Sequence, residues 1–255
     1  MAQIRCDRVG TVQVLTIDNE TKRNAFSGSM ADELVRHLDQ ADQTPGVRCV
    51  VITGAGDKAF SSGHDLSEIL DQGEASLSPE NNRAFIRPAS MAKPTIAAVN
   101  GAAYAGGLIL ALSCDLRVAS KNASFCVSGA RVGLLPIGGQ LSRLPRLMPY
   151  ARALEMVLAA EPMSAEEAHA VGFINRLVSQ GDALTASLEL AEKIAANSPS
   201  VVQKAKKGIE VSLRHGLAAS EAFEWETGPS LATTPDAKEG VRAFLEKRSP
   251  KFKDR

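Results

Sequence analysis

The sequence predicts an α/β protein with a core of parallel strands and a helical C-terminal part. The apolar segment 46–53 lacks the polar alternation of a surface strand, so it fits a strand that is buried on both faces. Twice, a β-rich segment is followed by glycines and then by an apolar helical segment, which is the pattern of strand and helix alternating along the chain. From about Pro149 onward only helical patterns follow.

Hydrophobic periodicity and helix-breaking residues predict the helices and strands of the first half of the chain. Residues 12–17 alternate and are rich in β-branched residues, whereas residues 27–41 place apolar side chains at a helical spacing. A helix over residues 80–91 ends at Lys93-Pro94, because the residue before proline disfavours helical backbone. The other expected segments are a helix starting at 63–70, a loop at 73–79, strands at 95–99, 115–119 and 124–127, and a helix at 106–113.

The second half is predicted to be helical. Ser164 and Glu167 have the spacing of a capping box, and Pro199 suits the first turn of a helix. The helix around Ile209 has an apolar stripe opposite lysines, and this stripe covers either its own core or another subunit. Helices are expected over residues 151–160, 164–170, 182–197, 199–215, 216–226 and 234–247.

The two glycine turns, at Gly63 and at Gly106-Gly107, are the main functional signal. A helix that follows a strand and glycines leaves the N–H groups of its first turn unpaired. Two such turns brought together aim two N–H donors at one oxygen. This arrangement is an oxyanion hole, which holds the negative charge that develops on a carbonyl.

Composition excludes several classes of function. The 255 residues contain 29 basic and 29 acidic side chains and only 4% aromatic ones, so nothing favours a nucleic-acid or membrane partner. No apolar window has the length of a membrane span, and the N-terminus lacks a secretory signal pattern. The four cysteines are widely spaced in apolar runs, which favours buried free thiols in the reducing cytoplasm over disulfides or a metal site.

Several motifs together resemble the crotonase superfamily, the enoyl-CoA hydratase/isomerase group. They include IDNETKRNAF at residues 17–26, KAFSSGHDL at 58–66 and the stretch from Asn100-Gly101 to Cys114-Asp115. Further matches are VGLLP at 132–136, LEMVL at 154–158, AHAVGFINRL at 168–177 and EGVRAFLEKR at 239–248. The similarity extends over nearly the whole chain.

This resemblance implies a fold, an assembly and a ligand. The fold is an α/β, Clp-like spiral of ββα repeats with a helical C-terminal trimerisation region. We expect the core over residues 1–196 and the helical region over 197–255, in a homotrimer or in a hexamer made of two trimers. The ligand is an acyl-CoA thioester, so coenzyme A enters as part of the substrate, and no permanently bound cofactor or metal is expected.

The resemblance also assigns site residues. The oxyanion-hole donors are the backbone N–H groups of His64 and Gly106, with the His64 side chain directed towards coenzyme A or solvent. The coenzyme A contacts are expected from Lys22, Arg23, Ala59, Phe60, Ser62, Asp65 and Leu66 of the same subunit. Phe244 and Lys247 are expected to reach the coenzyme A of a neighbouring subunit, where Lys247 pairs with a phosphate.

The chain departs from the family at the acid and base. Hydratases of this family hold a water between two glutamates. Counted without gaps, the first glutamate falls on Ile109 and the second on Gly129, and neither residue moves a proton. The aspartate of related dehalogenases and naphthoyl-CoA synthases belongs in residues 134–138, which contain no acid. We therefore expect a short trans-2-enoyl-CoA to be bound but hydrated slowly.

The possible substitutes for the glutamates all have structural explanations as well. Asp65 suits a helix start, Asp115 a turn, and Tyr104 either the acyl pocket or ordinary packing. Arg131 and Gln140 flank the second lost glutamate, where each either binds a polar acyl group or packs. The remaining acids and histidines fit surface or structural positions: Glu68, Asp71, Glu74, Glu226, His37, His169 and His215.

Two classes of function stay open. The first is an enzyme acting on enoyl-CoA or another acyl-CoA, either a hydratase with an atypical base or an isomerase or lyase. The second is a non-catalytic acyl-CoA-binding homologue. A serine hydrolase of Clp type is weaker, because residues 104–107 offer no serine. Dinucleotide binding is weak too, because Gly54 and Gly56 lack the third glycine of that motif.

Overall fold

The computed structural model describes residues 2–64 and 78–253, and it shows a mixed α/β protein built on two sheets. The larger sheet has the strand order β1-β2-β3-β5-β7-β10 and the smaller has β4-β6-β8-β9. Only the β1–β2 and β8–β9 pairs are antiparallel. The strands are β1 (Gln3–Val9), β2 (Val12–Asp18), β3 (Cys49–Gly54), β4 (Ala59–Ser61), β5 (Thr95–Val99), β6 (Ala102–Tyr104), β7 (Leu116–Ser120), β8 (Ser124–Cys126), β9 (Met163–Ser164) and β10 (Arg176–Val178).

Successive pairs of strands divide between the two sheets. β3, β5 and β7 pair in parallel in the larger sheet, and the strand that follows each of them, β4, β6 and β8, pairs in the smaller one. Each turn of the chain therefore adds one strand to each sheet. This is the ββα spiral that the resemblance implies.

Helices cover both faces of the larger sheet, which explains why its strands are continuously apolar. α8 (Ala183–Ala195) packs on the face that holds Cys49, Val51 and Ile96. α1 (Gly28–Gln43) covers the opposite face of the sheet. Val50 and Ile52 point to that face, because successive side chains of a strand point to opposite sides. Every residue of β3 is buried as a result.

The other short helices surround the smaller sheet and its connections. The Ser164 cap and Glu167 form the predicted capping box, which satisfies two donors at the start of α7. The short helices are η1 (Glu20–Lys22), α3 (Arg83–Ile86), η3 (Arg87–Ser90), α4 (Gly106–Ser113), η4 (Gly129–Val132), α5 (Gln140–Leu147), α6 (Tyr150–Ala159) and α7 (Ala165–Ala170).

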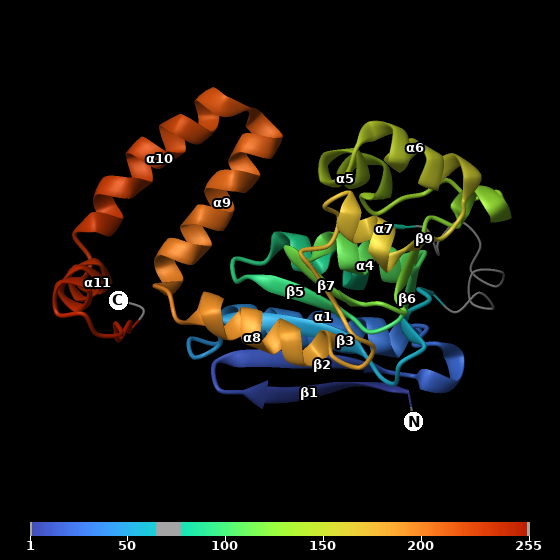
Figure 1. Cartoon of the computed structure of the whole chain (residues 1–255), viewed down its shortest axis with the longest axis horizontal. Helices are drawn as coiled ribbons and strands as arrows, with labels where there is room; N and C mark the ends of the chain where they lie inside the picture. The colour runs from blue at the N-terminus through green and yellow to red at the C-terminus, as the bar shows by residue number, and fades with distance from the viewer. Residues whose placement is uncertain (1, 65–77, 254–255) are drawn as a thin grey trace.

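Three C-terminal helices extend away from the sheets. α9 (Pro199–His215) and α10 (Leu217–Ala232) pack side by side as a hairpin, and α11 (Pro235–Leu245) follows. In Figure 1 this hairpin, drawn in orange, extends beyond the core. The three helices carry apolar residues that are largely exposed in the single chain: Ile209, Leu213, Leu217, Trp225, Val241 and Phe244. The chain passes from α8 to α9 between Ala195 and Pro199, beside the predicted boundary at 196.

Several expectations about elements need correction. The single helix expected over 80–91 is α3 followed by η3, because Pro88 has no backbone N–H with which to continue the α-helical hydrogen bonds. The helix α5 was missed, and the predicted helix 216–226 continues to Ala232 as α10. Most of the helix expected at 63–70 and of the loop at 73–79 lies outside the described residues.

The four cysteines are free thiols, but they are not all buried. Cys6 lies exposed on the edge strand β1, and the other three are buried. Burial raises the pKa of both Cys49 and Cys114 to about 12. These two thiols therefore stay protonated at neutral pH and are poor nucleophiles.

Candidate active site

The two glycine turns meet at one edge of the smaller sheet. β4 leads to Gly63, β6 leads to Gly106, and the two strands pair in parallel. Gly63 has a φ of 90°, and a Cβ built on it would lie 2.5 Å from the Gly106 nitrogen. A Cβ on Gly106 would lie 2.9 Å from the Gly63 Cα. Only glycine at both positions permits this approach, so the backbone of each turn contacts the other directly.

The second turn holds an unusual backbone conformation. Ala105 has φ 47° and ψ −117°, a combination that alanine rarely adopts. Its N–H donates to the Cys126 carbonyl at 3.2 Å, which ties the turn to β8. The strained turn presents Gly106 as the first residue of α4, whose residues are all buried.

The Gly106 N–H is available as a hydrogen-bond donor. It opens α4, so it has no carbonyl one turn earlier in the helix to bind. Within residues 2–64 and 78–253 it meets no acceptor. The positive end of the α4 dipole adds to its attraction for a partial negative charge.

The His64 side chain is held by α3 and the residue before it. Its Nε2 lies 3.2 Å from the Oδ1 of Asn82, and its ring contacts the Phe85 ring edge to face, with 4.8 Å between the ring centroids. Asn82 is buried, and its Nδ2 donates to the Ser78 carbonyl at 2.9 Å. The amide is thereby oriented with its oxygen towards His64. The imidazole is thus half-buried and packs against Asn82 and Phe85.

Ile109, where the first glutamate was expected, is buried in α4 one turn after Gly106. A Cβ on Gly138 would lie 2.8 Å from the Ile109 Cγ2. Gly138 therefore packs directly on this side chain, and the loop at 134–139 lies against α4. The surroundings of position 109 are apolar and closely packed.

Gly129, where the second glutamate was expected, has no room for a side chain. A Cβ there would lie 2.5 Å from the Leu134 carbonyl oxygen and 3.2 Å from the Pro136 Cγ. The loop that follows η4 thus fills the space that a longer residue would use. At position 129 the chain has neither an acidic side chain nor the space for one.

The other polar side chains named from the sequence have partners of their own. Tyr104 Oη lies 3.1 Å from the Ser124 hydroxyl, and Arg131 Nη2 donates to the Ala160 carbonyl at 2.7 Å. Asp115 accepts hydrogen bonds from the Thr95 N–H at 2.8 Å and the Thr95 hydroxyl at 2.9 Å. These contacts match the structural explanation of each residue. Gln140 differs, because its Oε1 is buried and meets no hydrogen-bond partner within residues 2–64 and 78–253.

Some of the expected coenzyme A contacts come together. Lys22 and Arg23 are exposed beside Ser62, whose N–H donates to the Arg23 carbonyl at 3.1 Å. Ala59 and Phe60 are buried in β4, which leads to the same turn. Asp65 and Leu66 lie outside the described residues.

The remaining two coenzyme A contacts lie elsewhere in the chain. Phe244 is 83% exposed near the end of α11, and Lys247 follows with a φ of 52°. In Figure 1, α11 is remote from the smaller sheet of the same chain. Within one chain these residues therefore do not join the candidate site.

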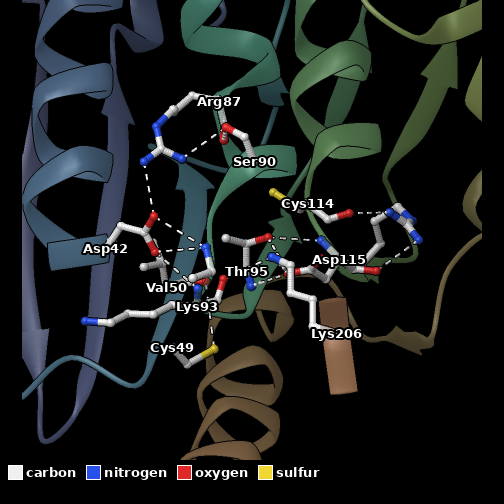
Figure 2. Close-up of polar contacts among 12 residues, drawn as sticks. Asp42, Cys49, Val50, Arg87, Ser90, Lys93, Thr95, Cys114, Asp115 and Lys206 are labelled. Atoms are coloured by element: carbon white, nitrogen blue, oxygen red, sulfur yellow. Dashed lines mark hydrogen bonds and ion pairs between the residues drawn. The ribbon is translucent and has the colours of Figure 1, made fainter. Parts of the chain in front are cut away.

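Asp115 also links the core to the C-terminal hairpin. Lys206 of α9 forms an ion pair with Asp115 at 2.7 Å and donates to the Lys93 carbonyl at 3.1 Å. Lys93 itself donates to the Ala41 carbonyl at 2.8 Å. Figure 2 shows these polar contacts around Lys206 of α9, together with Arg87 and Asp42, which form an ion pair. The cluster fixes α9 against the sheet, and the contacts named here involve neither glycine turn.

The described ranges 2–64 and 78–253 contain no group of three or more His, Cys, Asp or Glu side chains placed to hold a metal ion. None of their helices combines the length and apolarity needed to cross a membrane.

Comparison with known proteins gives consistent results. The family model described as "Enoyl-CoA hydratase/isomerase" matches residues 7–255. The enoyl-CoA hydratase EchA19 of Mycobacterium tuberculosis is 37% identical, over 98% of this chain and 96% of that protein. The 2,3-dehydroadipyl-CoA hydratase of Escherichia coli is 35% identical over the full length of both.

Solved structures agree with the predicted fold. The crystal structure of an enoyl-CoA hydratase from Bacillus anthracis superposes with a TM-score of 0.94 at 32% identity, covering 99% of this chain and 100% of the other. That of an enoyl-CoA hydratase from Mycobacterium tuberculosis H37Rv gives 0.93 at 34% identity, with full coverage of both. These matches confirm the predicted spiral α/β fold.

Proposed function

Because the chain belongs to the enoyl-CoA hydratase/isomerase family, we propose that it is an enzyme that binds an acyl-CoA thioester. The backbone N–H groups of His64 and Gly106 bind the thioester oxygen and stabilise the enolate formed when a Cα proton leaves. The single observation that carries this proposal is the direct contact between the Gly63 and Gly106 turns. This contact supports the proposal, because two N–H donors on touching turns can act together on developing charge with little reorganisation.

The same geometry argues against ordinary hydration. A hydratase needs a group that removes a proton from water and another that delivers a proton to Cα. Ile109 supplies neither, and the loop at Leu134 and Pro136 occupies the space beside Gly129. We therefore propose that crotonyl-CoA is bound but hydrated slowly. The enzyme is then an isomerase or lyase with an atypical base.

A non-catalytic acyl-CoA-binding protein is the second candidate. The closed packing around Ile109 and Gly129 favours it, because no carboxylate can take the place of either glutamate there without rearrangement. The glycine turns suit both candidates, since the two N–H groups also bind a ground-state carbonyl.

The C-terminal hairpin supports a homo-oligomer. Exposed apolar side chains on α9, α10 and α11, among them Ile209, Trp225 and Phe244, have no partner surface in the described part of the chain. We propose a homotrimer, or a hexamer of two trimers, in which Phe244 and Lys247 reach a neighbour's coenzyme A. The four free thiols fit a reducing compartment such as the cytoplasm.

The test combines binding with isotope exchange. Butanoyl-CoA is titrated calorimetrically against coenzyme A alone, and exchange of its Cα protons into D2O is followed by NMR. An enzyme of the proposed kind binds the thioester more tightly than coenzyme A and exchanges the Cα protons faster than buffer does. Binding without exchange identifies the non-catalytic homologue, and no binding contradicts both candidates.

A further inference from the structure

The direction of the His64 N–H is set from the other side of its peptide group. The carbonyl of that peptide belongs to Gly63, and it accepts a hydrogen bond from the Phe26 N–H at 2.8 Å. The N–H and C=O of a trans peptide lie in one plane and point in opposite directions. The bond from Phe26 therefore fixes the line along which the His64 N–H points. It also polarises that N–H, because linked hydrogen bonds polarise one another.

The Gly106 N–H is fixed in the same way. Its peptide carbonyl belongs to Ala105 and accepts from the Ile109 N–H at 3.1 Å, in a helical hydrogen bond at the start of α4. Each donor peptide is therefore anchored at its carbonyl, one to the segment before α1 and the other to α4. The two anchors belong to different parts of the chain, so the separation of the two N–H groups depends on what packs against both.

The ring of Phe85 contacts both anchored halves. Phe85 is fully buried in α3, and its Cζ would lie 2.9 Å from a Cβ built on Gly106, so the ring edge packs on that glycine. The same ring packs edge to face on the His64 ring, with 4.8 Å between centroids, and on the Phe26 ring, with 5.0 Å. One side chain thus contacts the residue of each donor and the residue that anchors the first donor.

We propose that Phe85 is a positioning residue that sets the separation of the His64 and Gly106 N–H groups. This rests on the proposed function, since it assumes that both groups bind the thioester oxygen. Protein interiors are close-packed, so a rigid ring in contact with both halves transmits its shape to both of them. A smaller or more flexible apolar side chain would fill part of the space but would not hold the two N–H groups at one separation.

The test observes the bound carbonyl directly, by 13C NMR of butanoyl-CoA labelled at its thioester carbon. Hydrogen bonds from both donors polarise the C=O bond and move this resonance downfield from its position in the free ester. The variant is Phe85→Leu. The matched control is Phe173→Leu, which removes an equally buried ring that packs edge to face on Phe125 at 5.0 Å. Phe85→Met replaces Phe85→Leu, with the same expectation, if circular dichroism shows that the first variant does not fold.

We expect Phe85→Leu to lose most of the downfield shift, whereas Phe173→Leu keeps it. Exchange of the Cα protons should slow by about 100-fold in Phe85→Leu, which is the effect of misplacing a group by about 1 Å. The dissociation constant should rise by no more than about tenfold, the contribution of one net hydrogen bond.

A purely structural role for Phe85 would weaken both leucine variants alike and leave the bound resonance in place. That result would overturn the inference while leaving the proposed function intact. If butanoyl-CoA binds to the unmodified protein with its resonance unshifted, or does not bind, the proposed function itself fails, and the inference fails with it.

Discussion

Replacing Gly63 by alanine should disrupt the candidate oxyanion hole. The new Cβ would lie 2.5 Å from the Gly106 nitrogen, whereas an ordinary contact begins at 3.4 Å, so one turn must move by about 0.9 Å. A misplacement of about 1 Å in a reacting group can cost about 100-fold in rate. The expected result is exchange of the butanoyl-CoA Cα protons that is about 100-fold slower, together with weaker binding.

The stability cost can be separated from the positional effect. Alanine at a positive φ costs about 1–2 kcal/mol, and overpacking adds about 1–3 kcal/mol. Gly181 has the same φ of 90°, with no atom within 4 Å of a built Cβ. Gly181→Ala is therefore a control that carries the backbone strain without the clash. The reasoning is refuted if Gly63→Ala binds and exchanges like Gly181→Ala.

Three further predictions concern other parts of the structure. Lys206→Met should lower the free energy of unfolding in urea by about 1–3 kcal/mol, because it leaves Asp115 without its cation. The exposed Lys207→Met control should change it by less than about 0.5 kcal/mol, and an equal effect in both would count against a fixing role for Lys206. Burial raises the pKa of Cys114 from an ordinary 9.0 to about 12. The contribution of this thiol to the free energy of unfolding should therefore be fully present below pH 9 and decrease between pH 9 and 12, because only the unfolded thiol ionises in that range. Cys114→Ala should make that fall shallower, and an unchanged slope in pH-dependent unfolding would contradict the assignment. Gly129→Ala should destabilise by about 1–3 kcal/mol in thermal unfolding, through its clash with the Leu134 carbonyl, and a neutral result would show that the loop yields readily.

Local patterns predicted much of the fold. The helical period of residues 27–41 gave α1, whose Ser27 cap accepts from the Met30 N–H. The continuous apolar run around Val50 gave a strand buried on both faces, because that pattern reports how many faces are covered. The capping box at Ser164 was likewise visible, since its two residues are only three apart.

The failures arose where local signals conflicted or were absent. α5 carries Pro145 in its interior and begins directly after two glycines, which are all signals against a helix. Cys6 was expected to be buried, but it lies between Arg5 and Asp7 on the edge strand β1 and is exposed. Its charged neighbours were a local signal against burial, whereas the local signals in α5 were against a helix that does form.

The candidate site was predictable only in part. Two glycine turns in similar contexts indicated that their N–H groups could converge, and the structure places the turns in contact. The pairing of His64 with Asn82 joins residues 18 positions apart through the fold, and only the i,i+3 spacing of Asn82 and Phe85 gave a weak hint. The burial of the Gln140 oxygen depends on the path of the loop at 134–139, and no local sequence pattern predicts that path.

A crystal structure of the butanoyl-CoA complex tests the central claim most directly. We predict the thioester oxygen within about 2.7–3.2 Å of the backbone nitrogens of both His64 and Gly106. A complex in which that oxygen contacts neither nitrogen, with the acyl chain bound elsewhere on the protein, would contradict the account.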